Sequence, residues 1–82
     1  MSGELTKARR ETLEHCPDWS APFEILWRRH EATGDIISMT GLEQTLGWLR
    51  NRGLVEYGPG NSTYRQTDAG RALLSQEKAN AD

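Results

Sequence analysis

The sequence has a single cysteine, few aromatic residues and no long apolar run. One cysteine among 82 residues cannot form an intrachain disulfide and cannot build a zinc site. No stretch approaches the roughly 18 apolar residues of a membrane helix, and the N-terminus has no apolar signal core. The chain is also too short for two typical domains. We therefore expect one small domain in a reducing cytoplasm, without membrane contact.

An excess of either charge is missing as well. Ten Lys and Arg stand against twelve Asp and Glu, so the net charge is −2. Charged residues make up 27% of the chain, close to the usual value of about 25%, and the apolar residues recur periodically. This pattern excludes a disordered polyelectrolyte and indicates a folded domain.

The residues that carry catalysis or bind metals are also scarce. His15 and Cys16 are neighbours, so they point apart on a helix and do not form a nucleophilic pair. We expect the remaining histidine, His30, to be partly buried and hydrogen-bonded. The stretch from Gly58 to Gly60 lacks the Lys-Ser or Lys-Thr that follows in a phosphate-binding loop. We predict no enzyme activity, no metal and no cofactor.

Three helices are predicted before residue 54. The first runs from about residue 5 to 16, and the second from a Ser20 N-cap to about residue 33. The third begins near Ser38 or Thr40 and ends at Gly53. The residues expected to face the core are Phe23, Leu26, Trp27 and His30 on the second helix, and Leu42, Leu46 and Leu49 on the third.

After Gly53 the apolar period changes from that of a helix to that of a strand. Residues 54–57 and 63–67 read as two strands, joined by a turn rich in glycine. Thr67 or Asp68 is expected to cap a last helix. We divide the chain into a flexible N-terminus at 1–4, a domain at 5–74 and a polar C-terminal tail at 75–82.

The stretch from Thr40 to Leu74 resembles the winged helix-turn-helix domains of MarR, PadR and ArsR regulators. The resemblance rests on Gly53-Leu54-Val55 after a leucine-spaced helix, followed by a hairpin. A pattern similar to the family's Tyr-x-Leu-Thr-x-x-Gly-x-x-x-Leu comes next, with Gln66 where the family usually has an apolar residue. The resemblance implies a mainly α fold with a small β-hairpin. Its element order is helix-helix-helix-strand-strand-helix, with a three-helix core plus a wing.

The resemblance further implies that the third helix enters the major groove of double-stranded DNA, with the wing on the backbone. This interpretation makes the protein a small transcriptional regulator of bacterial or phage type. It would read DNA as a homodimer, with the dimer contact formed by its first or last helix. Base contacts are expected from Gln44, Asn51, Thr45 and Arg50, and phosphate contacts from Arg52, Thr40, Asn61 and Arg65. The full set of expected DNA-binding residues is Thr40, Gly41, Glu43, Gln44, Thr45, Trp48, Arg50, Asn51, Arg52, Asn61, Ser62 and Arg65.

The alternative is a winged-helix module that binds a protein, such as a phage protein that binds a host protein. From residue 55 to 67 only Arg65 is positive and Glu56 is negative, so the wing would neutralise few phosphates. Trp48 lies about 120° from the leucine direction and is a candidate contact for a protein partner. It could equally pack beneath the wing, against a tyrosine. We expect Trp27 in the core and Trp19 as a lid over it.

Overall fold

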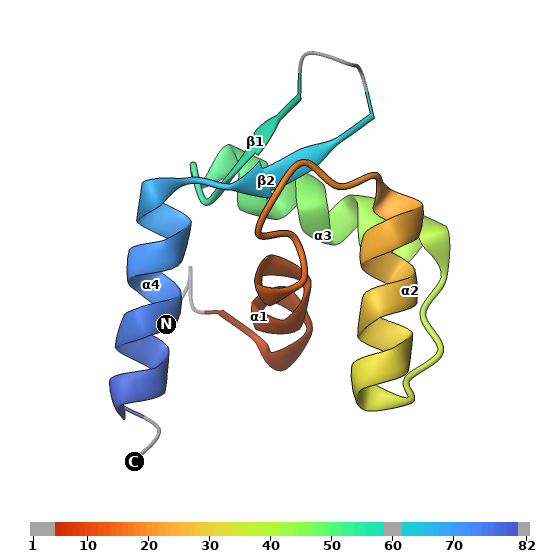
Figure 1. Ribbon diagram of the computed structural model, residues 1–82, viewed down its shortest axis with the longest axis horizontal. Helices are drawn as coiled ribbons and strands as arrows, with labels where there is room; N and C mark the ends of the chain where they lie inside the picture. The colour runs from red at the N-terminus through yellow and green to blue at the C-terminus, as the bar shows by residue number, and fades with distance from the viewer. Residues whose placement is uncertain (1–4, 59–61, 81–82) are drawn as a thin grey trace.

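The structure, a computed structural model, describes residues 5–58 and 62–80, with side chains up to residue 76. Its elements occur in the predicted order, and Figure 1 shows α1 between α4 and α2, with the hairpin projecting beyond them. The elements are α1 (Lys7–Glu14), α2 (Pro22–Thr33), α3 (Met39–Asn51), β1 (Val55–Tyr57), β2 (Tyr64–Gln66) and α4 (Asp68–Asn80). The three helices plus wing predicted from the sequence are therefore confirmed.

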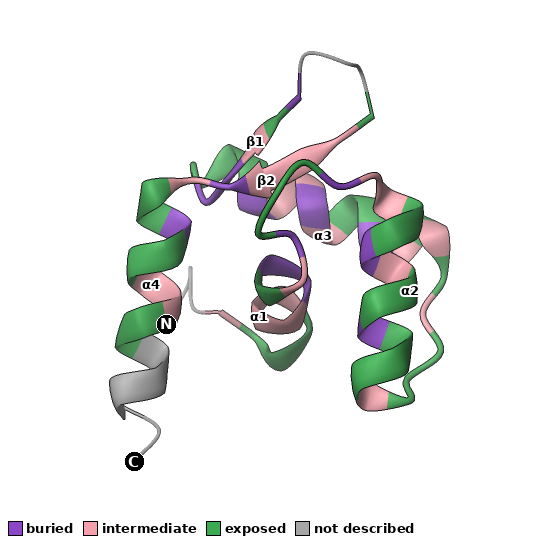
Figure 2. Ribbon diagram, in the orientation of Figure 1, coloured by how far each residue is buried: buried purple, intermediate pink, exposed green. Residues whose placement is uncertain are grey.

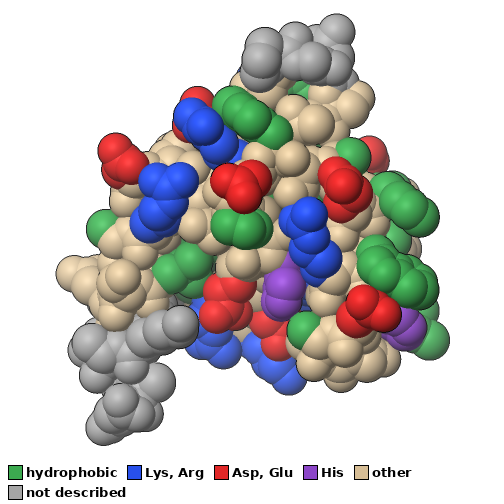
Figure 3. Space-filling view, in the orientation of Figure 1, with side chains coloured by type: hydrophobic (Ala, Val, Ile, Leu, Met, Phe, Trp, Pro, Cys, Tyr) green, Lys and Arg blue, Asp and Glu red, His purple; other side chains and the backbone are tan. Residues whose placement is uncertain are grey.

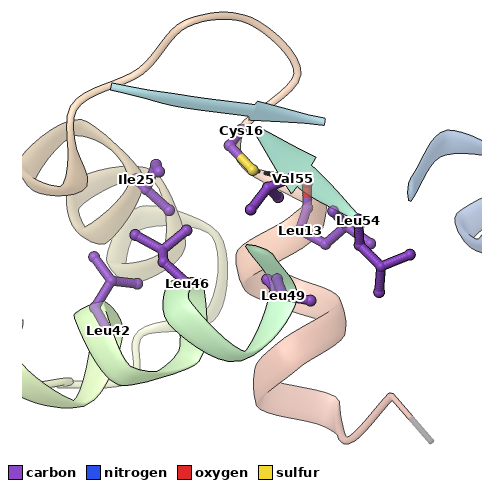
Figure 4. Close-up of a cluster of buried hydrophobic side chains, with 8 residues drawn as sticks. All are labelled: Leu13, Cys16, Ile25, Leu42, Leu46, Leu49, Leu54 and Val55. Atoms are coloured by element: carbon purple, nitrogen blue, oxygen red, sulfur yellow. Dashed lines mark hydrogen bonds between the residues drawn. The ribbon is translucent and has the colours of Figure 1, made fainter. Parts of the chain in front are cut away.

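The core lies where α1, α2 and α3 meet beneath the hairpin. Figure 4 shows three leucines of α3 pointing toward Leu13 of α1 and Ile25 of α2. These three are fully buried, as predicted: Leu42, Leu46 and Leu49. Burial of one narrow face of α3 leaves its opposite face outside the core.

The predicted core face of α2 is wrong for Phe23, Trp27 and His30, whereas the fourth predicted residue, Leu26, is half-buried and packs against the core. Phe23 is 67% exposed and Trp27 is 55% exposed, and His30 is exposed as well. The residues of α2 that are buried are Ile25 and Arg29, along the side that faces the rest of the molecule in Figure 2. The helix is thus rotated from the orientation that its aromatic residues predict.

Arg29 takes its place inside the protein because α1 supplies partners for its guanidinium group. It is 3% exposed, and its Nη1 donates to Thr12 Oγ1 at 2.8 Å. Its Nη2 lies 3.3 Å from Glu11 Oε1 in an ion pair. Nε has no hydrogen-bond partner among the described residues. A buried charge is tolerated only when it is paired in this way.

The start of α2 also differs from the prediction. The N-cap is Ala21, whose backbone N–H donates a hydrogen bond to the side chain of Glu24 at 2.9 Å. Ser20 instead forms a bridge with Tyr64, in which each backbone N–H donates to the other residue's carbonyl at 2.9 Å. Ser20 therefore ties the α1–α2 connection to the edge of β2.

The hairpin is antiparallel and sits on α1 through a polar side chain. Val55 faces Gln66, Glu56 faces Arg65 and Tyr57 faces Tyr64. Gln66 is 7% exposed, and its Nε2 donates to the Leu13 carbonyl at 2.7 Å. This bond explains why a glutamine occupies the position at which related motifs usually carry an apolar residue.

The last helix begins at the predicted cap. Thr67 Oγ1 accepts from the backbone N–H of Gly70 at 3.1 Å and donates to the Gly53 carbonyl at 2.6 Å. At Gly70 a Cβ would run into the Leu54 carbonyl, so no larger residue fits there. Helix α4 runs to Asn80 and thus includes most of the segment 75–82 that we describe from its sequence as a polar tail.

Replacing Arg29 tests the buried ion pair. We expect Arg29→Ala to lower the free energy of unfolding by roughly 3 kcal/mol, because it leaves Glu11 and Thr12 without their partner, beside a cavity. The matched control is Arg28→Ala, whose exposed guanidinium donates to the His15 carbonyl and Ser20 Oγ and should cost about 1 kcal/mol. Urea denaturation measures both. Equal midpoints for the two variants would contradict this account of the core.

Candidate nucleic-acid interface

The outward face of α3 carries most of the residues predicted to touch DNA. The helix starts at Ser38, whose Oγ accepts from the backbone N–H of Gly41 at 3.0 Å. The exposed members of the predicted set on this helix and its C-cap are Thr40, Glu43, Gln44, Arg50, Asn51 and Arg52. Gly41, Thr45 and Trp48 are half-buried. The hydroxyl of Thr45 donates within the helix to the Gly41 carbonyl at 3.0 Å, so its hydrogen is already engaged.

The two glycines of α3 have different surroundings. A Cβ at Gly41 would lie 3.1 Å from Ser38 Oγ, so the helix cap accounts for that glycine. A Cβ at Gly47 would meet nothing within 4 Å among the described residues. Packing within the described residues therefore does not require a glycine at position 47, although glycine weakens a helix by about 1 kcal/mol relative to alanine.

One flank of this face is formed by the hairpin. The Arg50 guanidinium lies 5.0 Å from the centre of the Tyr57 ring, and Tyr57 meets Tyr64 edge-on at 5.0 Å. Burial, with smaller effects of nearby groups, raises the pKa of the Tyr64 phenol above its ordinary value of 10.0. The phenol is therefore neutral at physiological pH.

Arg65 lies on the other side of the hairpin. Successive strand residues point to opposite faces, so Glu56 and Arg65 face away from the side that holds Tyr57 and Tyr64. Arg65 Nε forms an ion pair with Glu56 Oε2 at 3.1 Å, and its guanidinium lies 4.4 Å from the Trp19 ring centre. Trp19 is thus a partner of the hairpin, with 38% of its surface exposed.

The opposite flank of the α3 face is cationic. The ring centre of Trp48 lies near two guanidinium groups, 3.8 Å from that of Arg9 in α1 and 4.7 Å from that of Arg52. We refer to Arg9, Trp48 and Arg52 as the Trp48 stack. Trp48 is half-buried, and the ring contacts described for it are with these two guanidinium groups and not with a tyrosine of the wing, while its role as a contact for a protein partner stays a prediction. Cations over a tryptophan face are stabilised by about 0.5–1 kcal/mol at exposed sites.

The predicted residues thus fall into two groups. Those on α3 share one surface, whereas Arg65 lies on the far side of the hairpin. Ser62 is exposed shortly before β2. Asn61 lies outside the described residues. Arg9 was not among the predicted contacts. The four-residue spacing of Trp48 and Arg52 could have indicated their contact, but nothing in the sequence places Arg9 beside them.

The side chains of Cys16 and the two histidines each lie against a backbone carbonyl. The thiol is buried and donates to the Leu13 carbonyl, with a separation of 3.4 Å. Burial raises its pKa to about 12, against a smaller opposing effect of Arg28. His15 Nδ1 lies 2.7 Å from the Glu11 carbonyl, and His30 Nδ1 lies 3.1 Å from the Asp35 carbonyl. In the described part of the chain no three His, Cys, Asp or Glu side chains form a metal-binding group.

Comparison with solved structures confirms the fold. The structure of RosR from H. salinarum superimposes with a TM-score of 0.86 at 20% sequence identity, covering 99% of this chain and 77% of RosR. No protein-family model and no curated protein sequence matches the chain. The likeness, together with the element order, shows a winged-helix fold. Among the described residues, no helix is both long and apolar enough to cross a membrane.

The buried thiol has a measurable consequence. At pH 8 we expect iodoacetamide to modify Cys16 in the folded protein at least about a thousandfold more slowly than in urea, because the thiolate is the reactive form. The folded pKa lies above the ordinary value of 9.0, so folding stability is retained below pH 9 and falls as the pH rises from 9 toward 12. Mass spectrometry of alkylated protein checks the rate, and similar rates in both states would disprove the burial.

Proposed function

We propose that the protein binds double-stranded DNA as a small transcription regulator, and that it acts by binding and not by catalysis. One observation carries the proposal: the exposed polar face of α3 lies between the hairpin and the Trp48 stack. The winged-helix fold supports it, since such folds commonly present this helix to the major groove. The MarR-like, PadR-like or ArsR-like motif from Thr40 to Leu74 is consistent with the same role.

The exposed amide side chains of α3, together with Arg50, are the residues that we expect to contact the bases. Gln44 and Asn51 can each pair with an adenine through two hydrogen bonds, and Arg50 can pair with a guanine. All three are exposed, and Arg50 is held beside the Tyr57 ring. Gly47 lies on the same face between the two amides. We propose that its missing side chain lets the nucleic acid approach α3 closely.

Phosphate contacts fall mainly to the Trp48 stack. Arg52 is exposed at the C-cap of α3. Because its side chain is already stacked on Trp48, it loses less conformational entropy when it binds a phosphate. Arg65 stays a predicted phosphate contact, but its ion pair with Glu56 reduces the positive charge that it offers. The protein is therefore expected to bind DNA more through α3 and its α1 flank than through the wing. Two copies reading two half-sites complete the proposal.

Gly47→Ala separates folding from recognition. The substitution should raise the free energy of unfolding by about 1 kcal/mol, because alanine favours the helix and the added methyl group meets no atom of the described structure. It should weaken binding to duplex DNA severalfold if DNA approaches the helix at this point. Thermal unfolding and fluorescence anisotropy measure the two effects. A variant that is more stable and binds as well as the parent would exclude close contact at Gly47.

Salt dependence tests the phosphate assignment. Each phosphate contact contributes about 0.9 to the slope of log affinity against log salt concentration. We expect Arg52→Gln to reduce this slope by about that amount. The matched control, Arg71→Gln on α4, should leave it unchanged, because Arg71 is paired with Asp68 and is not among the predicted DNA contacts. Gln44→Ala should reduce discrimination between sequences more than it reduces binding to random DNA.

Two results would overturn the assignments. If Arg52→Gln and Gln44→Ala both bind like the parent, the surface is wrong. If the folded parent protein binds no random duplex even at low salt, the DNA-binding proposal itself fails.

A further inference from the structure

A strip of apolar side chains lies exposed along α2 and the segment that follows it. We define the α2 strip as Phe23, Leu26, Trp27, Ile36 and Ile37. Phe23, Trp27 and Ile36 are 67%, 55% and 92% exposed, and the other two are half-buried. With His30 and Asp35 they line a groove of about 210 Å³. Figure 3 shows hydrophobic side chains gathered over α2 at the edge of the molecule.

The strip is separate from the proposed DNA-binding surface. It contains no residue of α3, of the hairpin or of the Trp48 stack. On α2, Phe23 and Trp27 lie away from the buried Ile25 and Arg29, whereas the half-buried Leu26 also packs against the core. Clusters of large exposed apolar side chains on a small monomer typically mark a binding site.

The charged residues that border the strip are mainly acidic. Glu24 and Glu31 lie three residues before and four after Trp27, so they flank it along one side of the helix, and both are exposed. Asp35 is exposed at the end of the groove. The guanidinium of Arg28 is directed elsewhere, since it donates to the His15 carbonyl and to Ser20 Oγ. The imidazole of His30 lies beside the Trp27 ring, with 6.0 Å between ring centres.

We propose that the α2 strip binds an amphipathic helix of a partner protein, with an apolar face bordered by lysine or arginine. Phe23 and Trp27 stand one helical turn apart, so they present an elongated row that matches the apolar side chains of a second helix. The groove beside them has room for one large apolar side chain. The acidic border attracts a basic partner and selects against an acidic one.

A second copy of this chain fits the strip less well. Two such strips packed face to face would bring Glu24 and Glu31 of one copy against the same carboxylates of the other, and like charges in contact oppose association.

The proposal is tested with two synthetic helical peptides that share a leucine face. One carries lysine beside the leucines and the other carries glutamate. Isothermal titration calorimetry should detect binding of the lysine peptide and at least tenfold weaker binding of the glutamate peptide. Trp27→Ser should weaken binding of the lysine peptide at least tenfold, and Glu31→Lys should weaken it severalfold.

The matched control is Tyr57→Ser, which removes a comparably exposed aromatic residue from the hairpin and should bind the lysine peptide like the parent. Circular dichroism establishes that each variant is folded, and Trp27→Ser should bind duplex DNA unchanged, which separates this surface from α3. Equal binding of the lysine peptide by Trp27→Ser and the parent would overturn the proposal. So would a dimer in sedimentation that Trp27→Ser converts to a monomer, since the occupant would then be a second copy.

Discussion

The burial of three leucines from one narrow face of α3 determines how the rest of this protein is arranged. Leu42, Leu46 and Leu49 pack against α1, α2 and β1, and the helix is thereby fixed with its polar side outward. The same packing brings the hairpin to one edge of that side, through Arg50 and Tyr57, and α1 to the other, through Arg9 and Trp48. The polar surface that we propose to read DNA thus follows from the packing of the core.

The second determining contact is the buried guanidinium of Arg29, and its effect extends to the surface. Thr12 and Glu11 of α1 pair with its two terminal nitrogens, so α2 turns its Arg29 side inward. An α-helix that turns one side inward must turn the opposite side out, and here that side carries Phe23 and Trp27. The exposed strip and the buried charge are therefore two results of one helix rotation. A hydrophobic residue in place of Arg29 would remove the cost of burying a charge, yet α1 would then keep an unpaired Glu11 beside the core.

The sequence predicted the element order, the leucine face of α3 and the Thr67 cap, because each depends on residues close together in the chain. Helical spacing and turn composition report such local preferences directly. The orientation of α2 could not be predicted in this way. Its apolar stripe is real, but the partners of Arg29 lie on another helix, and single-sequence patterns do not report contacts between helices. The same limit applies to Gln66, whose bond to the Leu13 carbonyl spans most of the chain, and to Arg9 beside Trp48.

The distribution of charge shows how a protein with a net charge of −2 can still place cations beside the surface that we propose to bind DNA. The wing places its cation in an ion pair with Glu56, and acidic side chains gather beside the α2 strip, whereas Arg50 and Arg52 stand beside the polar face of α3. Local potential, and not net charge, decides which surface attracts phosphate at short range, because charges beyond about 10 Å are screened at physiological salt. Two surfaces of opposite preference can therefore coexist on one small domain. The cationic flank of α3 suits nucleic acid, and the acidic border of α2 repels it and favours a basic helix.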